Sequence, residues 1–491
     1  MSLSILLFAA TIVLTLVITV WASRRSGDVS ELYTAGGRIT GGQNGLAIAG
    51  DFLSATTLLG VTGLFFAGGV DAGLYFLCPL VGFGLMLLLI AGPLRRLGRF
   101  TLGDVVETQL GDRRLRLFSG VTTVVVCLIY LVAQMVGAGS LISILFGLSF
   151  NTAVVIVGGL VAVYVAFGGM LAATWVQMVK AVMLSLAVIV LAILVLVTAG
   201  GAPALYDGAA RAHALGEGLY RSGGMGLDLF SAASLSAGLI LGMLGLPHVL
   251  IRLLTVPDEK AAKKSIVVAT SLTGLIFALL FAVVGPGAVL LVTGQARFEG
   301  ADGKILGGGN MAIMHLARAL GGEAFFGIMA AVAFATVLAV GAGRAIAAAT
   351  ALTHDLYRSL RPVALDERTE RRVFRLATLA LLAISVLVAI VFQKENTAFL
   401  ASLAFAVAAS ASFPVLVLAI YWRGLTAAGA LWGGATGLAA SSAFIVLGPS
   451  VWVKALGHAQ PVVPWDHPTL ITAPLAFAVI VAVSRLTARR A

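Results

Sequence analysis

The 491-residue chain is 60% hydrophobic and only 11% charged, with a formal net charge of +11. A soluble globular protein is about 45–50% apolar and about 25% charged, so this composition excludes a water-soluble enzyme. The apolar residues form long unbroken runs rather than the ~10-residue alternating stretches of an outer-membrane barrel. We therefore expect an all-α polytopic membrane protein.

A helix needs roughly 20 apolar residues to cross the hydrocarbon core. On this basis we predict thirteen transmembrane helices, at residues 4–22, 44–69, 73–92, 118–147, 152–168, 171–199, 229–254, 265–293, 323–352, 373–393, 397–421, 426–447 and 468–485. The first run has neither a basic n-region nor a small-residue cleavage site, so it reads as a retained span rather than a signal peptide. Residues 1–491 are expected to form a single membrane domain.

The basic residues predict the orientation of these spans. Of the 32 lysines and arginines, 24 fall on one side of the predicted membrane and seven on the other, and Arg344 falls inside a span. Because basic loops stay in the cytoplasm, we expect the N-terminus outside and the C-terminus in the cytoplasm of the plasma (inner) membrane. This distribution accounts for the net charge without nucleic-acid binding. Arg344 is expected to extend towards the cytoplasmic end of its helix.

Three predicted spans contain residues that interrupt helices. Residues 45–57 combine glycines, Asp51 and three hydroxyl side chains, and residues 242–248 contain Pro247. In the ninth span, residues 333–336 are followed by Gly341, Gly343 and Arg344. Irregular backbone at membrane depth is tolerated only beside a cavity. Paired interruptions in two halves are typical of secondary transporters with inverted repeats.

Because the second and seventh spans are five apart, we predict two inverted repeats, at residues 42–199 and 229–421. Residues 4–22 form a peripheral first span, and residues 426–485 hold two peripheral C-terminal spans. This arrangement indicates a secondary transporter.

Several stretches resemble the cation/acetate symporter (acetate permease) subfamily of the sodium:solute symporter family. They are Tyr33–Ala55, Ala133–Ile142, Val165–Ala181, Leu244–Arg252, Ala331–Val340, His354–Tyr357, Phe405–Pro414 and Leu447–His458. The resemblance is collinear over nearly the whole chain. It implies a thirteen-span protein with a five-plus-five inverted-repeat (LeuT-like) core, and uptake of acetate and other short monocarboxylates.

The same resemblance implies a sodium site. Its ligands correspond to the carbonyl groups of Gly50 and Leu53, the carbonyl of Val332 or Ala333, and the hydroxyl of Thr336. Oxygen ligands are what hard cations prefer. Sodium-coupled relatives place two adjacent hydroxyl residues in the ninth span, whereas this chain has one, which keeps proton coupling open. No other cofactor and no catalytic residue are expected.

Five polar residues are candidate ligands for a small organic anion: Ser54, Thr56, Thr57, Gln134 and His248. Hydroxyl groups and free N–H groups at the start of a half-helix hold a carboxylate without a basic residue. The alternatives are that the hydroxyl groups bond to the preceding turn, that Gln134 links helices and that His248 is a packing residue.

Asp51 is the only carboxylate well inside a predicted span. A charge there costs about 2.5–3.5 kcal/mol on insertion scales, so Asp51 needs a partner, a proton or water. It is a candidate proton-linked residue, and the alternative is a structural acceptor at the helix break.

The sequence therefore predicts symport of acetate and other short monocarboxylates into the cell, coupled to Na+ or H+, by alternating access. The motifs of hydrolases, metalloproteases and phosphate-binding loops are absent from the sequence, so we expect no enzyme activity. The alternatives are a sodium symporter of another small organic solute, or a non-transporting solute sensor or channel. The sequence makes no prediction of oligomeric state.

Overall fold

The computed structural model describes residues 4–10, 12–13, 17, 39–97, 102–167, 170–301, 303–357 and 367–488. Of the predicted first span, 4–22, residues 11, 14–16 and 18–22 lie outside the described ranges. Within the described ranges the regular elements are all helical, which confirms the predicted all-α class.

The helices of the first half extend from the N-terminal part of the described chain to residue 212. They are α3 (Gly41–Phe52), α4 (Ala55–Gly68), α5 (Leu74–Leu85), α6 (Ala91–Leu97), α7 (Leu102–Leu110), α8 (Arg113–Phe146), α9 (Phe150–Phe167), α10 (Met170–Ala199) and α11 (Ala202–Ala212). A 3-10 turn (Gly69–Gly73) joins α4 to α5, and a π-helical turn (Met86–Ile90) joins α5 to α6.

The helices of the second half begin with another broken pair. They are α12 (Leu229–Gly245), α13 (Pro247–Leu253), α14 (Glu259–Leu279), α15 (Gly285–Val292), α16 (Ala312–Thr350), α18 (Glu367–Val391), α19 (Thr397–Ser410), α20 (Ser412–Tyr421), α21 (Ala427–Leu447) and α22 (Thr469–Ala488). Shorter 3-10 and π-helical segments lie at Gly216–Tyr220, Leu280–Val284, Gly309–Met311, Ala351–Tyr357 and Pro449–Ala455.

Ten helical stretches of the described chain are long and apolar enough to cross a membrane. Two of them are much longer than one crossing requires, because Ala55–Leu97 has 43 residues and Gly309–Tyr357 has 49. The first contains Gly69, whose positive φ of 64° ends α4, and the second contains two non-helical glycines, Gly321 and Gly322. The exact count of thirteen spans therefore stays a prediction.

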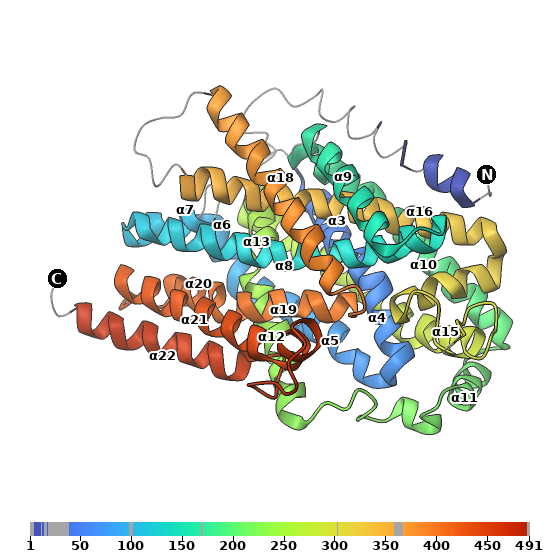
Figure 1. Ribbon diagram of the computed structural model, residues 1–491. Coiled ribbons are helices and arrows are strands. Elements are labelled where there is room, and N and C mark those ends of the chain that lie inside the picture. The colour runs from blue at the N-terminus through green and yellow to red at the C-terminus, as the bar shows by residue number, and fades with distance from the viewer. Residues whose placement is uncertain are drawn as a thin grey trace.

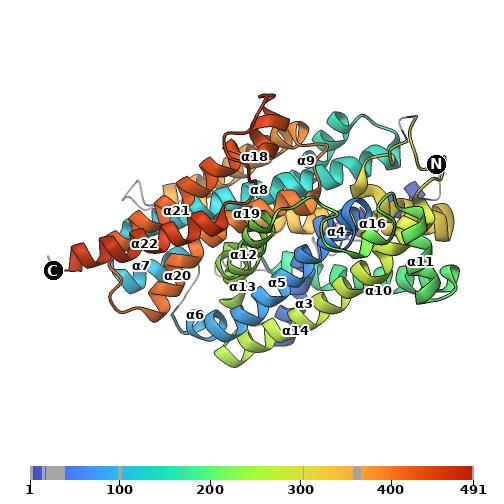
Figure 2. The same cartoon turned by 90° about the horizontal axis from the view of Figure 1, so that it is seen from below.

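The long helix α8 runs through the middle of the bundle beside α19 (Figure 1). Helices α21 and α22 pack against each other at one edge, and both views show α7 and the C-terminal end of α22 at the opposite end of the molecule from α11 (Figures 1 and 2). The basic end of α6, helix α7 and the C-terminal end of α22 thus share one end of the molecule. The assignment of that end to the cytoplasm stays a prediction.

The predicted interruption in the second span is confirmed. Helix α3 starts with a capping box between Thr40 and Gln43 and ends at Phe52. Leu53 then adopts φ −71° and ψ 73°, and the N–H of Ser54 donates to the carbonyl of Phe52 over 2.8 Å, which is the hydrogen bond of an inverse γ-turn. The Ser54 side chain caps α4 by accepting from the N–H of Thr57. Two half-helices therefore meet at this break.

The interruption predicted at Pro247 is also confirmed. Helix α12 ends at Gly245, Leu246 is extended (φ −69°, ψ 112°), and Pro247 is the first residue of α13. The residue before a proline disfavours the helical conformation, and proline suits the first helical position because its missing N–H is not needed there. The local sequence is thus sufficient to explain the break.

The interruption predicted at residues 333–344 is wrong. The only non-helical residues in α16 are Gly321 and Gly322, and the helix is regular from there to Thr350. Alanine is the best helix former, and the hydroxyl of Thr336 donates within its own helix to the carbonyls of Val332 and Ala333. Small residues in this segment therefore serve packing rather than a break.

Candidate functional site

The break between α3 and α4 frees two backbone carbonyl groups that a regular helix would use. The N–H of Ser54, the helical partner of the Gly50 carbonyl, donates to Phe52 instead, and the N–H of Thr57, the helical partner of the Leu53 carbonyl, donates to Ser54 Oγ over 3.4 Å. Gly50 and Leu53 are the two residues of α3–α4 that were predicted to bind a cation. Their carbonyl groups are thus released from α-helical hydrogen bonding by the turn itself.

The other predicted cation ligands lie on α16, which packs against both α3 and α4. Thr336 is fully buried, and its hydroxyl donates to the carbonyls of Val332 and Ala333. This hydroxyl keeps its oxygen lone pairs for a further partner. The chain therefore offers one side-chain oxygen and several carbonyl oxygens on the two facing elements.

Three of the five predicted substrate ligands are brought together. Gln134 on α8 donates through Nε2 to the hydroxyl oxygens of Ser54, over 3.3 Å, and Thr56. All three side chains are buried, and Gln134 Oε1 has no hydrogen-bond partner. We call Ser54, Thr56 and Gln134 the amide–hydroxyl site.

Thr57 and His248 do not join this site. The hydroxyl of Thr57 donates to the carbonyl of Phe52 over 2.7 Å, which is the bond to the preceding turn that was the alternative for this residue. His248 lies on α13, and its Nε2 is 3.3 Å from Nη2 of Arg344. It belongs to a second group of polar residues.

That second group surrounds Asp51. One oxygen of the Asp51 carboxylate accepts from Nη1 of Arg344 over 2.9 Å and from Nε2 of Gln177 over 3.0 Å. Gln177 also accepts, through Oε1, from Arg252. Lys180, one helical turn from Gln177 on α10, lies within electrostatic range of Asp51, Arg252 and Arg344. We call these residues, with His248, the basic cluster; its members are Asp51, Gln177, Lys180, His248, Arg252 and Arg344.

Arg344 corrects an expectation. The sequence suggested that its side chain extends to the cytoplasmic end of its helix, but it is 2% exposed and forms a buried ion pair with Asp51. Its guanidinium carbon also lies 4.5 Å from the centre of the Tyr130 ring, a cation–π distance. The structure thus pairs the Arg344 guanidinium with the buried Asp51 carboxylate instead of placing it at the membrane interface. Each ion then has a buried counter-charge.

Three further cluster members, Gln177, Lys180 and Arg252, were missed as functional candidates. Lys180 and Arg252 counted towards the cytoplasmic loop charges, but they lie on α10 and α13 and are 2% and 4% exposed. A signal was present in the spacing, since Gln177 and Lys180 are three residues apart and His248 and Arg252 four apart. Such spacings place two side chains on one helical face.

The two groups are neighbours along α8. Tyr130 and Gln134 are four residues apart, which corresponds to about 6 Å along a helix. The Tyr130 ring contacts the basic cluster through His248, at 5.2 Å between ring centres, and lies 5.9 Å from the ring of Phe405. Tyr130 thus stands between the amide–hydroxyl site and the basic cluster.

The close approach of α3 and α10 explains one glycine of this region. A Cβ atom on Gly50 would lie 2.2 Å from the carbonyl oxygen of Gln177. Only glycine fits at that distance, so Gly50 is required for the packing that brings Gln177 to Asp51.

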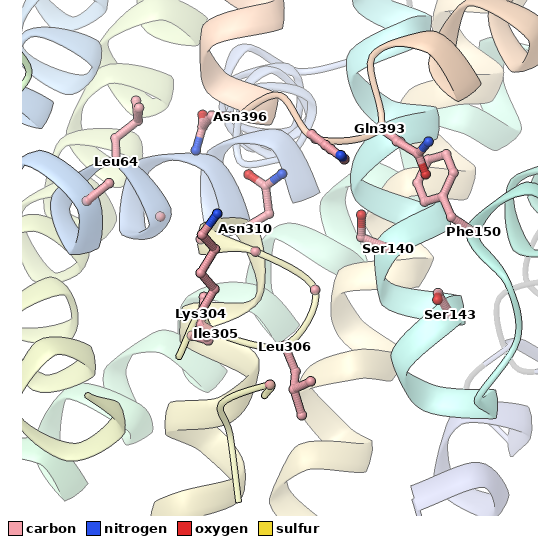
Figure 3. Close-up of a pocket in the computed structure, with 17 residues that line it drawn as sticks. Leu64, Ser140, Ser143, Phe150, Lys304, Ile305, Leu306, Asn310, Gln393 and Asn396 are labelled. Carbon is pink, nitrogen blue, oxygen red and sulfur yellow. The ribbon is translucent and has the colours of Figure 1, made fainter. Parts of the chain in front are cut away.

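A cavity of about 730 Å³ lies on the other side of the amide–hydroxyl site. Asn310, Asn396 and Lys304 line it from one side, and Ser140, Ser143 and Phe150 line it from the other (Figure 3). Two hydrogen bonds link the lining of this cavity to the amide–hydroxyl site. Asn310 Oδ1 accepts from the N–H of Thr397, and the hydroxyl of Thr397 donates to the carbonyl of Thr56. The loop at residues 294–322, which contributes much of this lining, is predicted to face the outside.

Comparison with known proteins identifies the family. The sequence pattern of the sodium:solute symporter family matches residues 32–437. The chain belongs to this family. It is therefore a multi-pass membrane transporter and not an enzyme, and family membership supports Na+ as its coupling ion.

Solved structures support the predicted LeuT-like transporter fold. The chain is similar to a Na+-coupled sialic acid symporter in a substrate-bound outward-open state, with a TM-score of 0.77, 15% identity, and coverage of 99% of this chain and 98% of that one. It is also similar to a nucleobase-cation-symport-1 family transporter in a closed conformation with bromovinylhydantoin bound, with a TM-score of 0.57, 14% identity, and coverage of 94% and 96%. At such identities the likeness shows the fold, and the ligand assignments rest on this chain's own geometry.

Proposed function

We propose that the protein is a Na+-coupled symporter that takes acetate and other short-chain monocarboxylates into the cell by alternating access. The observation that carries this proposal is the position of the amide–hydroxyl site, directly at the α3–α4 break and one helical turn of α8 from a buried excess of positive charge. Donor groups and positive potential together favour an anion.

The substrate ligands in this proposal are Ser54, Thr56 and Gln134. The donor groups are the hydroxyls of Ser54 and Thr56, which the Gln134 amide holds in place by donating to their oxygens, and the first turn of α4 adds the partial positive charge of a helix N-terminus. A zwitterionic or cationic solute is disfavoured, since Asp51 is already engaged by Arg344 and Gln177. Thr57 and His248 are proposed to act indirectly, Thr57 by fixing the turn and His248 by contacting Arg344.

The cation ligands in this proposal are the carbonyls of Gly50, Leu53 and either Val332 or Ala333, and the hydroxyl of Thr336. A cation bound there ties α3–α4 to α16 and favours the conformation that receives the carboxylate. The ion pair between Asp51 and Arg344 favours Na+ over a proton carried by Asp51, because the Asp51 charge already has a partner.

The charge balance sets the driving force. One Na+ carried with one monocarboxylate moves no net charge, so the membrane potential contributes nothing and a tenfold Na+ gradient supplies about 1.4 kcal/mol. Each additional cation would add roughly 2.3 kcal/mol per 100 mV. We propose the one-to-one, electroneutral form, in the plasma membrane with the N-terminus outside.

Competition for uptake tests the substrate class. Purified protein in liposomes with an inward Na+ gradient is given labelled acetate with an excess of unlabelled acetate, propionate, pyruvate, lactate or proline. We expect the short monocarboxylates to suppress uptake and proline to leave it unchanged. Suppression by proline with no effect of propionate would favour another small solute, the alternative that the family leaves open.

A further inference from the structure

The basic cluster carries an excess of buried positive charge that the proposed transport site does not use. Among the residues the structure describes, it combines the basic side chains of Lys180, Arg252 and Arg344 with the single carboxylate of Asp51, a formal net charge of +2 with all three basic groups protonated and His248 neutral. Every one of these side chains is less than one-tenth exposed. Buried charges are normally paired, so two cations of this cluster lack a counter-charge.

The uncompensated charge coincides with unused hydrogen-bond donors. Lys180 Nζ and Arg252 Nη1 are buried and have no hydrogen-bond partner, and the same holds for His248 Nδ1. Lysine and arginine side chains offer donors only. A ligand for these atoms must therefore be an acceptor, and the excess charge requires it to be an anion.

The cluster also has a defined place relative to the proposed substrate site. Helix α13 leads from the Leu246 break towards α6, because Arg95 on α6 donates to the carbonyls of Val256 and Pro257 just beyond α13. The cluster thus lies on the α6 side of the amide–hydroxyl site, away from the 730 Å³ cavity. On the predicted orientation, this is the route from the substrate site to the cytoplasm.

We propose that Lys180, Arg252 and Arg344 form a second binding site, for a small monovalent anion, on the inward side of the substrate site. Its occupant is either the carboxylate of the transported substrate or a small inorganic anion such as chloride. Lys180 Nζ and Arg252 Nη1 bind the anion directly, and Gln177 holds Arg252 and Asp51 in place on either side of it. The carboxylate occupant rests on the proposed function, whereas the anion site itself does not.

Anion binding to the purified full-length protein tests this site. Equilibrium binding of labelled acetate and, separately, of labelled chloride is measured in sodium 2-(N-morpholino)ethanesulfonate, whose anion is too bulky for the cluster. The test variant is Lys180→Met, which keeps an unbranched side chain one atom shorter than lysine and removes its charge. The control variant is Lys260→Met, which removes an exposed lysine of α14.

We expect the wild type and Lys260→Met to bind two acetate ions per chain. In Lys180→Met, the affinity of one of them falls by about tenfold or more, the equivalent of at least about 1.4 kcal/mol, while Gln134→Ala weakens the other. Removing an uncompensated cation does not impair folding, so the thermal unfolding temperature of Lys180→Met without anion should equal or exceed that of the wild type.

The outcomes separate this site from the proposed function. Chloride binding that Lys180→Met abolishes, with no acetate binding, supports the anion site and rejects the carboxylate substrate. If the protein takes up acetate, and if Lys180→Met binds acetate and chloride as the wild type does, the proposed function stands and the second site is overturned. The second site is also overturned by a wild type that binds one acetate, sensitive only to Gln134→Ala, and whose chloride binding does not change in Lys180→Met.

Discussion

The ion pair between Asp51 and Arg344 gives the sharpest prediction about stability, because its two partners are not equivalent. Asp51→Asn removes the only negative charge described in the basic cluster and raises its net charge from +2 to +3. The asparagine oxygen still accepts from Arg344 and Gln177, which now donate to Asp51 over 2.9 and 3.0 Å. The substitution thus changes charge with little change in shape.

Removing one partner of a buried ion pair costs about 3–5 kcal/mol. An unfolding entropy of about 2.1 cal/mol/K per residue, taken over 491 residues, corresponds to about 1 kcal/mol per degree. Asp51→Asn should therefore lower the unfolding temperature by about 3–5 °C. Arg344→Met should lower it less, because it reduces the net charge to +1 and leaves Asp51 with Gln177 and two nearby cations.

Thermal unfolding of purified protein, followed by intrinsic tryptophan fluorescence, measures both effects. The double variant Asp51→Asn with Lys180→Met restores a net charge of +2 and should recover part of the lost stability, a coupling that a double-mutant cycle isolates. Equal destabilisation by Asp51→Asn and Arg344→Met, with no recovery in the double variant, would refute the charge-excess account.

Three further predictions concern the cation, the substrate and pH. Thr336→Ala should raise the Na+ concentration for half-maximal uptake by about tenfold, because it removes one ligand worth about 1.4 kcal/mol. Thr336→Ser keeps the oxygen and is the control. An unchanged Na+ dependence in both variants would exclude Thr336 from the cation site. In uptake kinetics, Gln134→Leu should raise the KM for acetate far more than it lowers kcat, and Gln134→Asn should have a KM between those of the wild type and Gln134→Leu. A loss of folded protein alone would indicate a packing role for Gln134. His467 lies outside the candidate spans, and burial lowers its pKa to about 4. Its contribution to the free energy of unfolding is therefore present above about pH 6.5 and is lost between pH 6.5 and 4, by up to about 3 kcal/mol. His467→Gln should flatten the acid side of the unfolding profile, and an identical profile would reject this assignment.

The sequence predicted the features that depend on local chemistry. Pro247 and the Gly50–Ser54 stretch identify the two helix breaks, because a missing N–H and a capping hydroxyl act within a few residues. The meeting of Gln134 with Ser54 and Thr56 depends on residues about 80 positions apart, and the sequence predicted these residues only as separate candidate ligands.

The sequence failed where burial and long-range pairing decide. Arg344 and Asp51 are 293 positions apart, so nothing local to Arg344 distinguishes extension to the interface from an ion pair. Lys180 and Arg252 both lie within predicted spans, and the packing of α10 and α13 against α3 brings them near Asp51. The regularity of α16 was also misjudged, since small residues that pack tightly look the same in sequence as residues that break a helix.

The most direct test of Na+-coupled carboxylate transport is the initial rate of labelled acetate uptake into liposomes under one ion gradient at a time. We predict rapid uptake with an inward Na+ gradient at equal pH, independent of an imposed membrane potential, and slow uptake with an inward proton gradient in the absence of Na+. Uptake driven by the proton gradient alone, or by neither gradient, would contradict the account.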